Sequence, residues 1–283
     1  AMIADALAEK PFYIGETEKQ VLPTFNWEEP QQDNLLKSVL WDIHKATGAR
    51  MGEFAGYDMP LWYDSVQSEH LSVRKGAGVF DVTHMGVWDI QGAGAENFLN
   101  MVTTNDLQRL KVGDSHYTFF LGTDGVPLDD LLIYRLAADH FFLVVNASND
   151  AKDWAWINLL AEQFGQEISL RDLRAESSGP DRRVDIALQG PNSRDILLQM
   201  AASDDDKAII KSLKWAGVTR VTLGGFDLIL SRTGYTGERV AYELFPHPDD
   251  APVLFKKLIE LGATPCGLAS RDSLRIEAGL PLY

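Results

Sequence analysis

Two apolar segments joined by a short polar turn constrain the fold of this chain most. Residues 116–121 and 127–136 are rich in aromatic and branched side chains, and Thr123-Asp124-Gly125 lies between them. This pattern predicts a β-hairpin. We expect a third strand at 140–146 and then a helix at 149–164, which opens with polar and acidic residues. Hairpin strands followed by a helix favour an α+β fold over a doubly wound parallel sheet.

The same order of strand, strand and helix recurs later in the chain. Residues 218–238 predict a second hairpin around Gly224-Gly225, and a helical pattern follows. The stretches 116–160 and 218–260 share no visible residue repeat. We therefore interpret them as a structural pseudo-repeat.

Periodicity predicts further elements outside these two stretches. Residues 1–33 show no clear period and are interpreted as an N-terminal arm, with 34–283 forming the main domain. The polar run 203–207 is interpreted as a solvated turn. The remaining expected helices lie at 34–48, 67–76, 95–102, 250–262 and 270–279, and the remaining expected strands at 87–91 and 184–191.

Composition excludes several classes of function. The net charge is −15, which argues against binding to a nucleic-acid backbone. Cys266 is the single cysteine and the six histidines are scattered, so we expect neither a disulfide nor a metal site. No apolar run approaches the roughly 18 residues of a membrane helix. These features favour the bacterial cytoplasm, or the mitochondrial matrix if the source is eukaryotic.

The segment QGAGAEN at 91–97 invites a dinucleotide-binding interpretation because it lies between a predicted strand and a predicted helix. Asn97 stands where the third glycine of that motif belongs, and no acidic partner for a ribose is placed convincingly. A tight turn from strand to helix is the better interpretation.

Asp129 and Asp130 sit at the head of an otherwise apolar strand, where carboxylates are rare without a partner. Successive side chains of a strand point to opposite faces. Asp130 is therefore expected to share a face with Leu128, Leu132 and Tyr134, and Asp129 to face the other way. Two opposed carboxylates disfavour a paired-carboxylate mechanism. We expect one aspartate to bond backbone N–H groups and the other to be available for function.

Seven blocks of sequence occur in an order that resembles a known family. The resemblance covers about residues 35–283 and is to the aminomethyltransferase (T-protein) of the glycine cleavage system. The blocks are FAGYDMPLWY (54–63), VRKGAGVFDVTHMG (73–86), DDLLIY (129–134), VVNAS (144–148), ALQGP (187–191), SRTGYTGE (231–238) and GLASRDSLRIEAGLPLY (267–283).

The resemblance implies a fold, a co-substrate and a partner. The fold is an α+β folate-binding domain made of two ferredoxin-like halves with mixed and antiparallel sheets. The family's C-terminal β-barrel is missing from the present sequence. The implied reaction takes an aminomethyl group from the lipoylated H-protein, transfers its methylene to tetrahydrofolate and releases ammonia, without a metal or nucleotide.

The resemblance also implies roles for particular residues. Asp130 falls on the catalytic aspartate that bonds the pterin. The matching folate contacts are Met85, Tyr117, Tyr134, Val144, Asn146, Tyr235, Glu243 and Arg271.

Structural alternatives stay open for these residues. Met85 is alternatively explained as core filler, and the tyrosines as buried or rim aromatics. Asn146 is alternatively explained as a helix cap, and Arg271 as an ion-pair partner of Asp272 or Glu277.

The sequence also departs from the family before Glu243. GERVAYELF is one residue longer than the family pattern, which loosens the alignment of that glutamate. Three alternative functions remain. One is a tetrahydrofolate-dependent demethylase on the same scaffold, another a non-enzymatic folate-binding accessory protein, and the third a fragment of a flavin-linked oxidase.

Overall fold

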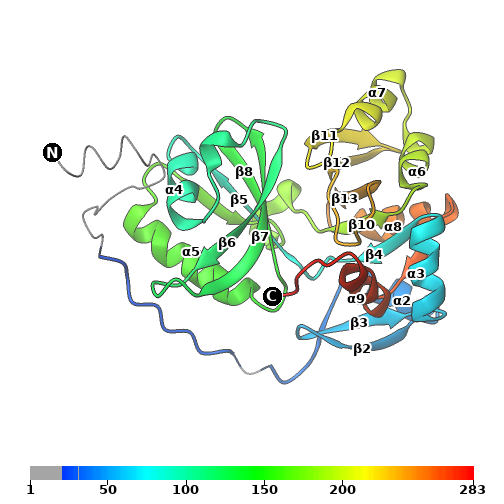
Figure 1. The fold of residues 1–283 in the computed structure, drawn as a ribbon, viewed down its shortest axis with the longest axis horizontal. Helices are drawn as coiled ribbons and strands as arrows, with labels where there is room; N and C mark the ends of the chain where they lie inside the picture. The colour runs from blue at the N-terminus through cyan, green and yellow to red at the C-terminus, as the bar shows by residue number, and fades with distance from the viewer. Residues whose placement is uncertain (1–20, 31) are drawn as a thin grey trace.

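The computed structural model describes residues 21–30 and 32–283. Most of the predicted N-terminal arm, residues 1–20, and residue 31 lie outside these ranges. Residues 21–30 form neither helix nor strand, and they run along the outside of the protein past α5 (Figure 1). Phe25 packs against Trp156 with their ring centroids 5.0 Å apart. The described part of the arm is therefore held against the domain by aromatic packing.

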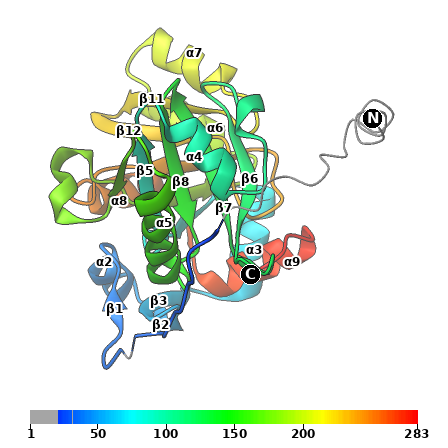
Figure 2. The ribbon, with the colours of Figure 1, turned by 90° about the vertical axis from the view of Figure 1, so that its left-hand side faces the viewer.

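The first half of the protein is an antiparallel sheet covered on one face by helices (Figures 1 and 2). Its strand order is β6-β7-β8-β5-β9. The strands are β5 (Gly86–Gln91), β6 (Ser115–Leu121), β7 (Pro127–Ala137), β8 (His140–Val145) and β9 (Ser169–Asp172). Helices α4 (Ala95–Val102) and α5 (Asp150–Phe164) pack on the face of Leu131 and Ile133, and η1 (Leu107–Arg109) joins the same core.

The second half repeats this arrangement in a mixed sheet of order β11-β12-β13-β10-β4-β14. Its strands are β4 (Gly78–Asp81), β10 (Ile186–Gln189), β11 (Val218–Leu223), β12 (Phe226–Ser231), β13 (Ala241–Phe245) and β14 (Thr264–Cys266). Helices α2 (Trp41–Ala46), α6 (Ser193–Met200), α7 (Asp204–Ser212) and α8 (Ala251–Glu260) pack on one face. Hairpin strands followed by a third strand and a helix thus occur in both halves, as the predicted pseudo-repeat requires.

A third, smaller sheet and three further helical segments complete the described part. The small sheet has the order β1 (Leu36–Lys37), β3 (Tyr57–Trp62) and β2 (Arg50–Phe54). Helices α3 (Val66–Lys75) and α9 (Leu268–Glu277) lie against each other, and η2 (Glu176–Asp181) lies between the two halves in sequence. The predicted α+β class, with mixed and antiparallel sheets, is confirmed. No helix in the described ranges is long and apolar enough to cross a membrane.

Two sequence predictions of local structure are wrong. The predicted helix 34–48 shrinks to α2 because Leu36 instead pairs with Tyr57 in a parallel ladder, and Val39 remains 42% exposed. The predicted turn at 203–207 is the start of α7, where Ser203 and Asp206 form a reciprocal capping box. In both places a specific contact overrides the pattern of apolar residues.

The glycine-rich turn at 91–97 is tight, as expected. Gly92 has a φ of +124°, and a Cβ atom there would lie 2.1 Å from the carbonyl oxygen of Glu167. A Cβ at Gly94 would lie 1.9 Å from the carbonyl oxygen of Gln166. These glycines are needed for close backbone packing.

The two halves meet through an apolar cluster that we call the inter-half core. It contains Tyr134, Phe142 and Val144 from the first sheet and Ile229 and Phe245 from the second. Each sheet thus has one face toward its own helices and one toward the other half. The candidate site is built at one end of this shared core.

Candidate functional site

Strand β7 separates the two adjacent aspartates as the pleat predicts. Asp129 is fully buried, on the same face of the strand as Leu131 and Ile133. Asp130 is partly exposed and lies on the same face as Tyr134. The expectation for Leu128 is wrong, because Leu128 packs with the core on the side of Asp129. The register shifts at this point, with Phe120 opposite Asp129 and Leu121 opposite Pro127. Leu128 is the extra residue of a β-bulge, which breaks the alternation.

Asp129 has a structural environment. Its carboxylate accepts hydrogen bonds from the backbone N–H of Asn146 (3.0 Å), the Asn146 amide (2.9 Å) and the Asn149 amide (2.7 Å). The neighbouring Asp153 is buried, and burial together with the nearby Asp129 carboxylate raises the pKa of Asp153 to about 10. Asp129 therefore fixes the junction between β8 and α5.

Asp130 has partners that leave it accessible. It accepts hydrogen bonds from the hydroxyl of Tyr117 and from the Asn146 amide. Tyr117 is 42% exposed, and burial together with the Asp130 carboxylate raises its pKa. The side chain of Asn146 bridges both aspartates, so the alternative of a helix-capping Asn146 is wrong. The position before α5 is taken by Asn149.

Tyr134 and Glu243 join the two halves. The hydroxyl of Tyr134 on β7 donates to a Glu243 carboxylate oxygen on β13 at 3.1 Å, and Thr233 donates to the same oxygen. Tyr134 is fully buried, and burial together with the Glu243 charge raises its pKa. Glu243, whose alignment with the family pattern is loose, thus lies beside Tyr134 of the inter-half core.

Arg271 on α9 is a partly buried cation whose guanidinium stacks on the ring of Tyr235 at 4.8 Å. Its Nη1 is buried with no hydrogen-bond partner among the described residues. The alternative ion pairs are wrong, because Asp272 pairs with Arg275 and Glu277 with Arg74. Burial lowers the pKa of Arg271.

Two apolar residues complete the set of site residues predicted from the sequence. Met85 packs against the inter-half core, to which Val144 belongs. The end of the chain passes the same region, where the Tyr283 hydroxyl donates to the carbonyl oxygen of Pro127 at 2.5 Å and Tyr235 donates to that of Pro281. The nine residues singled out from the sequence therefore gather around one end of the inter-half core.

Sequence reasoning missed two members of this cluster. Asp185 is buried with Oδ1 unpartnered among the described residues, and burial reinforced by the Glu243 charge raises its pKa. Thr233 accompanies Glu243. A signal for Asp185 existed, because it precedes an apolar strand much as the aspartate pair does.

This arrangement suits a flat, polar, nitrogen-rich ring. Carboxyl groups of Asp130, Glu243 and Asp185 offer acceptors to N–H donors, and Tyr117 and Tyr235 offer aromatic faces. The unpartnered Arg271 Nη1 and Asp185 Oδ1 are unmet donor and acceptor atoms in the same cluster. Among the described residues, no group of three or more His, Cys, Asp or Glu side chains is arranged to hold a metal ion.

Fold and site together define a class: an α+β protein of two similar halves that enclose acidic and aromatic groups at their junction. The family described as "GCVT N-terminal domain" matches residues 40–283, and this chain belongs to it.

Individual relatives agree with this assignment. An aminomethyltransferase of Symbiobacterium thermophilum is 40% identical over 258 residues, which cover 89% of this chain and 66% of the relative. One from Thermus thermophilus is 41% identical over 247 residues, covering 87% and 67%. The crystal structure of the glycine cleavage system aminomethyltransferase T from Bartonella henselae matches with a TM-score of 0.77 and 36% identity, covering 88% of this chain and 64% of that one. The chain thus spans about two thirds of the length of these relatives.

Proposed function

We propose that this chain carries the folate site and the catalytic aspartate of a tetrahydrofolate-dependent aminomethyltransferase. The reaction transfers the methylene of an aminomethyl group on the lipoylated H-protein to tetrahydrofolate and releases ammonia. Membership of the family supports the proposal, since its relatives are named aminomethyltransferases. The observation that best supports the proposal is the hydrogen bond from the Tyr117 hydroxyl to Asp130 at the edge of the inter-half core.

In this proposal Asp130 binds and orients the pterin and does not itself act as a nucleophile. Tetrahydrofolate supplies the nucleophilic nitrogen when it is bound. An ionised Asp130 accepts N–H groups of the ring, and Tyr117 together with Asn146 fixes the direction of the carboxylate. Orientation of this kind can lower a barrier by several kcal/mol.

The second half contributes recognition. Glu243 is held by Tyr134 and Thr233, so it presents its remaining acceptor positions in a fixed direction. Arg271 lies over Tyr235 with one nitrogen unpartnered among the described residues, which suits an acceptor on the ligand. Met85 and Val144 exclude water and thereby strengthen these bonds.

The test is a tetrahydrofolate titration followed by a transfer assay on the purified chain. We expect binding by calorimetry, and formation of methylene-tetrahydrofolate with ammonia release from aminomethylated H-protein. The same assay with methylated sulfur, oxygen or nitrogen donors separates transfer from the demethylase alternative. Turnover of those donors without turnover of the carrier protein would reject aminomethyl transfer, and binding without any turnover would leave only a folate-binding role.

A further inference from the structure

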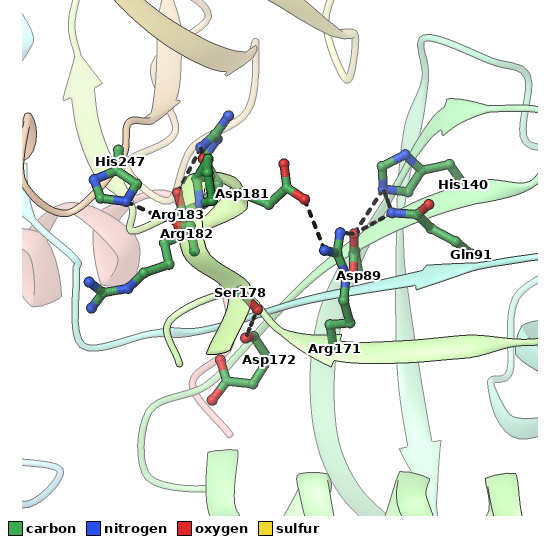
Figure 3. A network of polar contacts seen from close by, with 12 residues as sticks. Asp89, Gln91, His140, Arg171, Asp172, Ser178, Asp181, Arg182, Arg183 and His247 are labelled. Carbon is green, nitrogen blue, oxygen red and sulfur yellow. Dashed lines mark hydrogen bonds and ion pairs between the residues drawn. The ribbon is translucent and has the colours of Figure 1, made fainter. Parts of the chain in front are cut away.

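A second polar site lies at the seam of the two halves, apart from the residues described above. A cavity of about 60 Å³ is lined there by side chains of both halves, with Phe142 and Ile229 of the inter-half core among the lining residues. Figure 3 shows several of the charged residues around it. The charged and imidazole groups that line the cavity are Asp89, His140, Arg171, Asp181, Arg183 and Arg220.

One guanidinium of this cavity is fully paired. Arg171 donates to both oxygens of Asp89, at 3.0 and 2.7 Å, and to Asp181 at 2.9 Å, so that it lies between the two carboxylates (Figure 3). Asp89 also contacts His140 at 3.2 Å. The two carboxylates of the cavity are thus already engaged by Arg171.

Each of the other two guanidiniums keeps N–H groups without a partner among the described residues. Arg183 is 3% exposed; it donates to two backbone carbonyls and to Asp227 at 2.6 Å, but its Nε is buried and without a partner among the described residues. Arg220 on β11 is exposed, lines the cavity and forms no ion pair in the described part of the chain. Burial lowers the pKa of Arg183; the Asp227 charge opposes this shift, and the charge of Arg220 adds to it. The two cations therefore lie close enough to repel each other.

We propose that this cavity binds a small oxyanion, such as inorganic phosphate, between Arg183 and Arg220. A buried cation with an unused N–H is stabilised by an anionic partner, and the guanidinium fork matches the oxygens of phosphate or carboxylate. The volume has room for a few groups the size of a water molecule, each of which needs roughly 10–15 Å³ of such space, so a single oxyanion group fits and a nucleotide does not. Because the cations come from different segments, binding ties the segment that enters β10 to strand β11.

Thermal unfolding of the whole chain in phosphate tests this, with equal ionic strength kept by sodium chloride. Phosphate is expected to raise Tm by about 2–4 °C near saturation. Acetate, run in parallel, distinguishes a tetrahedral oxyanion from a carboxylate. Arg220→Gln should abolish the response, whereas Arg109→Gln, which removes the same charge from an exposed arginine, should keep it.

Calorimetric titration with phosphate provides a second readout. One site per chain that is lost in Arg220→Gln and retained in Arg109→Gln supports the proposal. Equal responses of the two variants, a response to chloride of the same size, or no heat and no shift with either oxyanion would overturn it.

Discussion

The two halves share a strand order but use it differently. In the first half, β6, β7, β8 and α5 follow one another, and the second half repeats this with β11, β12, β13 and α8. The first half places its acids on the middle strand of the three, at Asp129 and Asp130. The middle strand of the second half bears Asp227 near its hairpin, with a 67% exposed side chain paired to Arg183.

The acids of the second half that face the site lie elsewhere. Glu243 is on β13, and Asp185 directly precedes β10. Similar backbones therefore supply the two walls of the site, while the chemistry comes from non-equivalent positions. The pseudo-repeat explains the shape of the junction, and individual residues explain its function.

The largest expected effect is on the acid of the first half. Asp130→Asn should reduce transfer activity by about 10²–10⁴-fold, because a neutral amide no longer accepts two pterin N–H groups as a carboxylate does. The fold should be kept, since Asp130 is partly exposed. The measurement is the transfer rate together with circular dichroism. Normal turnover of a folded Asp130→Asn would refute the assignment of Asp130.

The acid of the second half should contribute mainly to binding. Glu243→Gln is expected to weaken tetrahydrofolate binding by roughly 10–100-fold, the effect of losing a hydrogen bond to a charged group. Calorimetric titration measures the dissociation constant. Asp227→Asn is the matched control on the middle strand of the same half and should leave binding unchanged. If both variants bound equally well, Glu243 would have no part in recognition.

Asp129, the buried neighbour of Asp130, is expected to contribute to stability more than to activity. Asp129→Asn should lower the free energy of unfolding by about 1–3 kcal/mol, because it leaves a donor amide facing the N–H groups of Asn146 and Asn149. Its loss of transfer activity should be much smaller than that of Asp130→Asn. Urea unfolding and the transfer assay measure the two quantities, and equal activity losses would contradict the separation of faces on β7.

The last expected effect is a change in the pH dependence of stability. Asp153 has a pKa raised from 3.8 to about 10, so the folded state holds a proton that the unfolded state loses above its ordinary pKa. Stability from this group therefore falls as pH rises through that interval, by up to about 1.4 kcal/mol per pH unit. Asp153→Asn should remove this slope. The free energy of unfolding of the variant should therefore increase relative to that of the parent protein as the pH is raised across the interval. If plots of the free energy of unfolding against pH ran parallel for the two proteins, Asp153 would hold no proton beside Asp129 in the folded state.

Local pattern was sufficient wherever neighbouring residues decide the structure. Alternation and turn residues determined both hairpins, and the pattern of residues along the chain determined α3, α4 and α5. The pleat of a strand also determined that Asp129 and Asp130 point apart, because that follows from backbone geometry alone. The helix start at Ser203 was missed although its signal is also local, a reciprocal bond with Asp206 three residues further on.

Only the tertiary structure decided which residues meet. Tyr134 and Glu243 are 109 positions apart in the chain, and their hydrogen bond exists because two separate sheets pack face to face. Packing likewise left Arg271 without its sequence neighbours as partners and placed Asp185 beside Glu243. Sequence determines the faces of each strand through the short-range sterics of the chain. Which faces then oppose one another depends on burying the apolar surface of both halves together.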